Sequence, residues 1–205
     1  PTDPTLTEDV VDENGEPLNE DVFEDLLEIE NGDDHGALQT MMAAMHDPSI
    51  DFETVLDRHF NRNNILVWLA TNILLHQTDG VTHNYLLHNP TGTERFYFVP
   101  WDYDGTLFAE NVLDPTATDN DSLGRRLYYG YARNVNNALI ARFLALPGTH
   151  DKLVQVAQWL SEQYLTPANI DAKATEMVAA IDPYRAREPD SLHYVDGTAY
   201  RPTEP

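Results

Sequence analysis

The most informative part of the chain is Asp79–Phe108, which reads DGVTHNYLLHNPTGTERFYFVPWDYDGTLF. Two short β-type runs, 85–88 and 95–99, flank the segment 89–93, whose proline and glycine are typical of a hairpin loop. An Asp and an Asn precede the first run, and a Pro-Trp-Asp-Tyr-Asp turn follows the second. The sequence therefore predicts a β-hairpin with carboxylate and amide side chains at its open end.

The spacing of these polar residues has a chemical meaning. Asp79 and Asn84 stand five positions apart, which is the Asp-x4-Asn spacing of a kinase catalytic loop. In such a loop the Asp orients a hydroxyl nucleophile, and the Asn reaches a divalent cation. A second carboxylate, brought back by a hairpin, completes the cation site, and Asp102 has the right place for it. The spacing alone occurs often by chance, so the hairpin and the Pro-Trp-Asp turn strengthen the interpretation.

The same residues carry a family resemblance. Asp-x4-Asn followed by Tyr, then a strand ending in Pro-Trp-Asp-x-Asp and a Thr-x-Phe, resembles the spore-coat CotH protein kinase family. The apolar stretch NILVWLATNILL at 64–75 is similar to the helix that leads into the family's site, and 137–144 and 165–170 are similar in a looser way. The resemblance covers about residues 50 to 185.

The resemblance implies a fold and a set of roles. The expected fold is α+β and mostly helical, similar to the C-terminal lobe of a protein kinase with one small hairpin. By resemblance Asp79 is the catalytic carboxylate, Asn84 and Asp102 bind the metal and nucleotide, and Asp104 is either a further metal ligand or a cap of the following turn. The implied cofactors are ATP with Mg²⁺ or Mn²⁺, whose hard ions prefer carboxylate and amide oxygens.

Each of these residues also has a plainer interpretation. Asp79 could be only a turn residue after a long helix. Trp101 and Phe108 are expected to be packing residues that fix the loop. His76, His83 and His88 match no common zinc signature, so a zinc site is not favoured. The pair Arg125 and Arg126 could touch phosphate, although a surface ion pair is the favoured interpretation.

Charge limits the partners. The 205 residues include 35 acidic residues against 12 Lys and Arg, which gives a formal net charge of −23. Such a chain is expected to repel nucleic acids and anionic membranes, because affinity for both depends on Lys and Arg. The acidity fits either a solvated acidic surface or attraction for cations or a basic substrate. Cysteine is absent, so no disulfide holds the fold.

Kinases also need a nucleotide clamp, which is a Lys on the phosphates and a Gly-rich loop over them. The first Lys or Arg is Arg58, and no Gly-x-Gly occurs in the chain. The simplest inference is that the chain is the second half of a CotH-like kinase, with the clamp on an upstream part. The alternative is a kinase that has lost it.

The chain divides into an acidic linker at 1–19, a kinase-lobe domain at 20–183 and an irregular tail at 184–205. The segment Asp12-Glu-Asn-Gly15 fails the EF-hand spacing and is expected to be a turn. Apolar spacing and caps predict helices near 20–30, 35–45, 51–56, 61–76, 133–146, 150–164 and 167–181, with Asp34, Asp51 and Thr166 as N-caps. A methionine stripe in the second helix is expected in the core.

The leading hypothesis is a CotH-like protein kinase that phosphorylates Ser or Thr of a protein substrate. Two others remain: a non-catalytic surface or coat module that binds protein partners, and a calcium-stabilised acidic surface protein. No run of residues is apolar and long enough to span a membrane. Family resemblance suggests a spore-surface, cell-surface or secreted location.

Overall fold

The computed structural model describes most helices and the hairpin of the chain. The described residues are 6, 11–14, 16, 18–25, 27–30, 32, 35–75, 77, 80, 84–103, 106, 137–185, 194–195 and 198–199. Contacts between residues divide the chain into two compact units, Pro1–Trp159 and Leu160–Pro205. The candidate site residues belong to the first unit.

The first unit begins with an Asx turn and two helices. Asp12 Oδ1 accepts hydrogen bonds from the backbone N–H groups of Asn14 and Glu16, so this segment is a turn, as predicted. Helix α1 is only Glu20–Glu24, shorter than the predicted helix over 20–30. The helix ends early because the carboxylate of Glu24 accepts from the N–H of Ile29 at 3.1 Å, in place of a helical carbonyl.

Helix α2, Gly36–His46, confirms the predicted methionine core. Its buried residues are Met41, Met42 and Met45. It packs against α3, Phe52–His59, which begins at the predicted cap Asp51 and runs three residues beyond Leu56. The Asp51 carboxylate accepts from the N–H of Glu53 at 3.0 Å.

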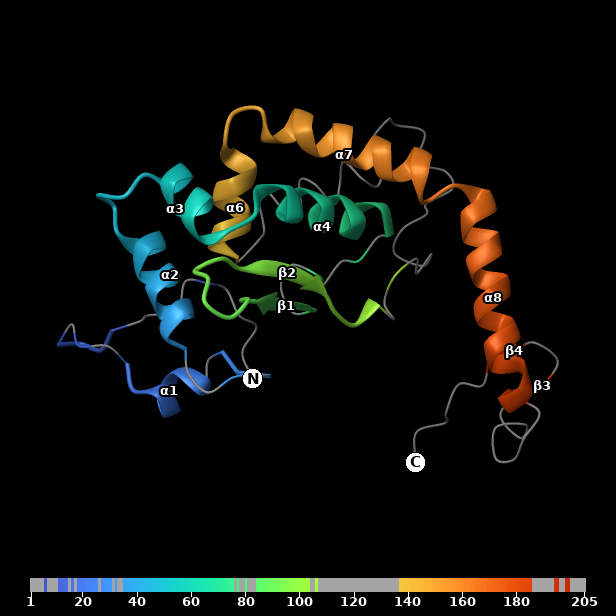
Figure 1. The fold of residues 1–205 in the computed structure, drawn as a ribbon, viewed down its shortest axis with the longest axis horizontal. Helices are drawn as coiled ribbons and strands as arrows, with labels where there is room; N and C mark the ends of the chain where they lie inside the picture. Colours follow the sequence, from blue (N-terminus) through green and yellow to red (C-terminus); the bar gives the residue numbers. More distant parts are fainter. Residues whose placement is uncertain are drawn as a thin grey trace. The chain divides into compact units, whose positions relative to one another are not determined.

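Helix α4, Arg62–Leu75, lies beside the hairpin, next to β2 (Figure 1). Asn61 caps its first turn by accepting from the N–H groups of Asn63 and Asn64. The helix buries Ile65, Leu66, Trp68, Leu69, Ala70 and Asn72, but Val67 is 39 % exposed, so the helix is buried on one broad side and not nearly all round as its apolar sequence predicts. Its contacts with the second strand of the hairpin make it the element on which the hairpin rests.

The predicted hairpin is confirmed. Strand β1, Tyr85–His88, pairs antiparallel with β2, Tyr97–Pro100, with His88 opposite Tyr97 and Tyr85 opposite Pro100 (Figure 1). The ring of Phe98 stacks on Trp68 of α4 with centroids 4.3 Å apart. Asn64 of α4 accepts from the N–H of Phe98 and donates to its carbonyl, so one amide fixes the strand's register on the helix.

Two further helices follow in the chain. Helix α6 is Ala138–Ala145, and the side chain of Asn137 caps it by accepting from the N–H of Ile140. The predicted helix began at 133, but 133–136 lie outside the described residues. Asn137 also donates to the Tyr85 hydroxyl at 3.1 Å, which ties α6 to β1. Helix α7, Thr149–Gln163, begins in the first unit and ends in the second.

The second unit contains α8, Pro167–Arg185, and a small strand pair. Thr166 accepts from the N–H of Asn169 at 3.2 Å, as expected of an N-cap before a helical proline. The helix continues past the predicted end at 181 and includes Pro183. Strands β3, Tyr194–Val195, and β4, Thr198–Ala199, pair within the segment that was predicted to be irregular.

Across the described residues the protein is mostly helical, with small antiparallel strand pairs. This confirms the α+β class predicted from the sequence. The further likeness to the C-terminal lobe of a protein kinase stays a prediction.

Candidate functional site

Two of the predicted site residues meet at the open end of the hairpin. Asn84 directly precedes β1, and Asp102 lies two residues after β2. Asn84 Nδ2 donates to the backbone carbonyl of Asp102 at 3.2 Å, although the two residues are 18 positions apart. Pairing of the strands thus brings them together, as the sequence predicts. Asp79 and Asp104 lie outside the described residues.

The backbone at Asp102 has an unusual conformation. Its φ is +49°, in the left-handed region, which Asp tolerates better than most residues because its short side chain can form local hydrogen bonds. The residue itself is exposed to solvent. Non-glycine residues held in this region are enriched at functional sites. The side chain of Asp102 is therefore presented outward from a constrained backbone.

The aromatic neighbours of Asp102 do not behave as expected. Trp101 was predicted to pack and fix the loop, but the residue is 57 % exposed. Tyr103 contacts helix α4 instead. Its hydroxyl donates to Asn72 Oδ1 of α4 at 2.5 Å. Burial of the phenol raises the pKa of Tyr103 to about 12, so it stays protonated and able to donate. Phe108 lies outside the described residues.

Two buried side-chain amides next to Asp102, those of Asn72 and Gln77, were not predicted from the sequence. Asn72 and Gln77 are both fully buried. Gln77 Nε2 donates to the carbonyl of Asp102 at 2.7 Å, and the backbone N–H of Gln77 donates to the carbonyl of Asn72 at 2.9 Å. A Cβ on Gly80 would stand 2.7 Å from Asn72 Oδ1, so glycine is needed there. The only sequence signal was polar Asn72 within an otherwise apolar helix.

The side chains present suit a hard divalent cation. Asn84 and Asp102 carry amide and carboxylate oxygens, which are the donors that Mg²⁺ and Mn²⁺ prefer. Within the part of the chain that the structure describes, no three His, Asp or Glu side chains converge on a possible metal position. A cation here would accordingly draw on Asn84, Asp102, the undescribed Asp79 or Asp104, and phosphate oxygens. Of the three histidines considered for zinc, only His88 is described, and it is exposed.

The cations that precede the site are already engaged elsewhere. Arg58 Nε contacts the carboxylate of Glu94 at 2.7 Å, which raises the pKa of Arg58 and lowers that of Glu94. Arg62 contacts the carboxylates of Glu53 and Asp57 at 3.0 and 2.7 Å. Neither guanidinium is therefore disposed to bind a nucleotide phosphate. Arg125 and Arg126 lie outside the described residues.

The model of the family described as "CotH kinase protein" matches residues 7–203, so the chain belongs to the CotH family. The match covers the hairpin, α4 and the predicted ligands Asn84, Asp102 and Asp104. It confirms the family identified from the Asp-x4-Asn and Pro-Trp-Asp-x-Asp residues.

The chain is also similar to a spore coat protein of known sequence. The chain is 26 % identical over 143 residues to the inner spore coat protein H of Bacillus subtilis (strain 168), an alignment that covers 69 % of this chain and 36 % of that protein. The chain thus spans little more than a third of that relative's length. No solved structure matches it. Among the described residues, no helix has the length and apolarity to cross a membrane.

Proposed function

We propose that this chain is part of a protein kinase that transfers the γ-phosphate of ATP to a Ser or Thr hydroxyl of a protein. The observation that carries the proposal is the meeting of Asn84 and Asp102 at the open end of the hairpin. Membership of a family described as kinases supports it. The name of the relative supports a spore coat setting.

The proposed roles follow from the chemistry of phosphoryl transfer. Asp79 accepts the proton of the Ser or Thr hydroxyl, and the oxygen of that hydroxyl bonds to the γ-phosphorus of ATP. The bond between the γ-phosphorus and the β–γ bridging oxygen breaks at the same time and releases ADP. Asn84, Asp102 and Asp104 would hold Mg²⁺ or Mn²⁺. When bound, the ion neutralises charge on the β- and γ-phosphates. The chain's own contribution is to position these side chains, because this reaction needs little other chemistry from the protein.

The test is phosphate transfer from γ-labelled ATP to a Ser-containing acceptor, with Mg²⁺ or Mn²⁺ and the full-length protein. Asp79→Asn and Asp102→Asn should each lower the rate at least about a hundredfold. Both keep the size of the side chain, and Asn tolerates the left-handed backbone at Asp102. Asp171→Asn on exposed α8 is the matched control and should leave the rate unchanged. Full activity in either site variant would remove that residue from the mechanism.

One observation favours a second candidate, a non-catalytic coat or surface module that binds protein partners. The two Arg residues before Asp79 are held by carboxylates, so the described part offers the nucleotide no clamp from that side. This candidate predicts no transfer by the folded full-length protein. It also predicts that Asp79→Asn leaves assembly with partners intact.

A further inference from the structure

The backbone carbonyl of Asp102 accepts hydrogen bonds from two side chains that both precede it in the chain. Gln77 Nε2 donates at 2.7 Å from just beyond the end of α4, and Asn84 Nδ2 donates at 3.2 Å from the start of β1. Gln77 is fully buried and Asn84 is 7 % exposed, whereas Asp102 is exposed. Both donors therefore hold the backbone of Asp102 and leave its carboxylate to face outward.

The next residue supplies a second anchor. The Tyr103 hydroxyl donates to Asn72 Oδ1 at 2.5 Å, inside the apolar helix α4. Thr106 closes the turn, because its N–H and its hydroxyl both donate to the carbonyl of Tyr103, at 3.2 and 2.7 Å. Tyr103 is thus bound to α4, and Thr106 to Tyr103, through neutral hydrogen bonds.

These contacts account for the conformation of Asp102. A left-handed φ of +49° is a minor state for an L-residue on its own. Leaving it would turn the Asp102 carbonyl away from both donors and deprive buried Gln77 of its 2.7 Å acceptor. Losing a partner is costly for a buried polar group. The two donors therefore select the left-handed state and, with it, the direction of the carboxylate.

We propose that Gln77 is a positioning residue that fixes the metal-binding carboxylate of Asp102, with the Tyr103–Asn72 contact as its second anchor. Gln77 acts through the backbone of Asp102 and touches neither substrate nor metal. The consequence for catalysis rests on the proposed phosphoryl transfer, whereas the consequence for the turn does not. This role requires residue 77 to carry a hydrogen-bond donor where Gln77 Nε2 stands, within reach of the Asp102 carbonyl.

Two substitutions separate donor chemistry from simple packing. Gln77→Glu keeps the shape but replaces the donor by a carboxylate oxygen, which repels the Asp102 carbonyl. Gln77→His restores a donor, because His Nε2 stands the same number of bonds from Cα as Gln Nε2. Tyr103→Phe keeps the buried ring and removes only the hydroxyl. Gln158→Glu, on the exposed side of α7, is the matched control.

Two measurements are made on the full-length protein. The first is the Mn²⁺ concentration that gives half-maximal phosphate transfer, and the second is amide hydrogen exchange of the segment 97–106. Gln77→Glu should raise the half-saturating Mn²⁺ concentration by about fivefold to tenfold and speed exchange, with the rate at saturating Mn²⁺ less affected. Tyr103→Phe should shift both in the same direction by about threefold. Gln77→His and Gln158→Glu should stay close to wild type.

Equal impairment by Gln77→Glu and Gln77→His would overturn the proposal, because packing alone would then explain the residue. Unchanged exchange and Mn²⁺ dependence in Gln77→Glu would overturn it too. If Gln77→Glu does not fold, Tyr103→Phe and Gln77→His decide the matter by the same two measurements. If the wild type transfers no phosphate but exchange of 97–106 rises only when the donor is lost, the proposed function fails and the positioning role stands.

Discussion

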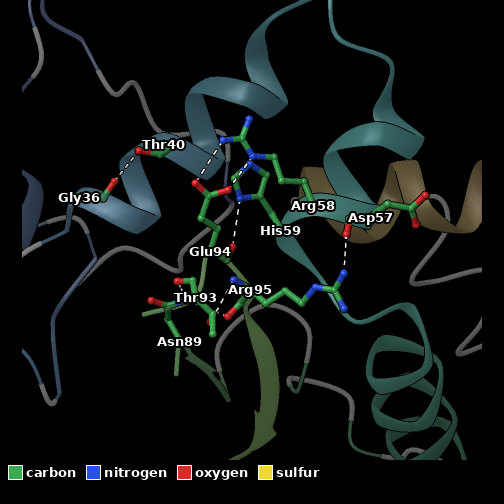
Figure 2. A network of polar contacts seen from close by, with 9 residues as sticks. All are labelled: Gly36, Thr40, Asp57, Arg58, His59, Asn89, Thr93, Glu94 and Arg95. Atoms are coloured by element: carbon green, nitrogen blue, oxygen red, sulfur yellow. Dashed lines mark hydrogen bonds and ion pairs between the residues drawn. The ribbon is translucent and has the colours of Figure 1, made fainter. Parts of the chain in front are cut away.

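The two ends of the β1–β2 hairpin are held to the helices by different chemistry. At the loop end exposed charged side chains make two of the contacts, beside the buried ring of His59: Arg58 of α3 binds Glu94, and Arg95 donates to the carbonyl of Asp57 at 2.9 Å (Figure 2). At the open end the contacts are neutral and buried, and they come from the amides of Gln77 and Asn84. Of the proposed metal ligands, the two that the structure describes, Asn84 and Asp102, lie at the open end.

The difference shows where the fold needs precision. Exposed ion pairs are weak and screened by salt, so the loop end can shift without much cost. Buried hydrogen bonds between neutral groups tolerate little displacement, because a lost partner is not replaced by water. We expect the open end to be sensitive in activity and the loop end to be sensitive, at most, in stability.

The largest effect should come from removing the support that both ends share. Phe98→Ala deletes a ring that is 2 % exposed and stacks on Trp68. The free energy of unfolding should fall by about 3–5 kcal/mol, measured by urea denaturation. Val99→Ala, the exposed neighbour on the same strand, is the control and should change it much less. A loss below about 1 kcal/mol for Phe98→Ala would mean that the hairpin does not rest on α4.

Glycine substitutions compare the two ends directly. Gly80→Ala forces a Cβ to within 2.7 Å of Asn72 Oδ1, which should cost about 1–3 kcal/mol and also lower phosphate transfer. Gly92→Ala in the hairpin loop meets no atom within 4 Å, but its φ is +77°, so strain should cost about 1–2 kcal/mol. Thermal unfolding and transfer rates are measured for both. Equal activity loss in the two variants would contradict the distinction between the ends.

His59 makes the loop end sensitive to acid. The ring is buried, with Nδ1 3.2 Å from the carbonyl of Glu94, and burial lowers the pKa of His59 from its usual 6.5 (Figure 2). The folded state therefore binds this proton less readily than the unfolded state does. The resulting stability is complete above pH 6.5 and declines as the pH falls from there through the folded pKa.

The check is the melting temperature from about pH 8 to about pH 5, for wild type and His59→Gln. The variant is expected to start lower and to lose less on acidification, because residue 59 no longer titrates. A parallel decline of the two curves would assign the acid sensitivity to other groups.

The smallest effect is expected for the exposed ion pair itself. Glu94→Gln removes the charge opposite Arg58. The melting temperature should fall less than in Gly92→Ala, and the difference should vanish in about 1 M salt, where screening is nearly complete. A large decrease that persists in high salt would show that the two ends are not as different as their chemistry implies.

Much of the fold could be predicted because its signals are local. Asp51 and Thr166 cap helices through their own neighbours in sequence, and the turn at Asp12 forms in the same way. The hairpin follows from two β-type runs around a loop with proline and glycine. Helix α1 was predicted too long, because its apolar spacing continues while the carboxylate of Glu24 accepts from the N–H group of Ile29.

For the candidate site, the sequence predicted the metal-binding side chains but not the residues that hold them in place. Asn84 and Asp102 were found by spacing and by their places around the hairpin, and the structure brings them together. Asn72 and Gln77 were not found, because a buried amide in or after an apolar helix gives no sign of its partner. Trp101 and Tyr103 flank Asp102 in the sequence, and sequence alone could not say which of the two contacts α4.

The sequence by itself determined the CotH family, the α+β class, the hairpin and the order of the polar residues around it. These depend on periodicity, turn residues and spacing, which are properties of neighbouring positions. The tertiary structure alone decided that Asp102 takes a left-handed conformation and that Gln77, Asn84 and Tyr103 hold its turn on α4. Those contacts join residues 18 to 31 positions apart, and only the packing of strand on helix brings such residues within hydrogen-bond distance.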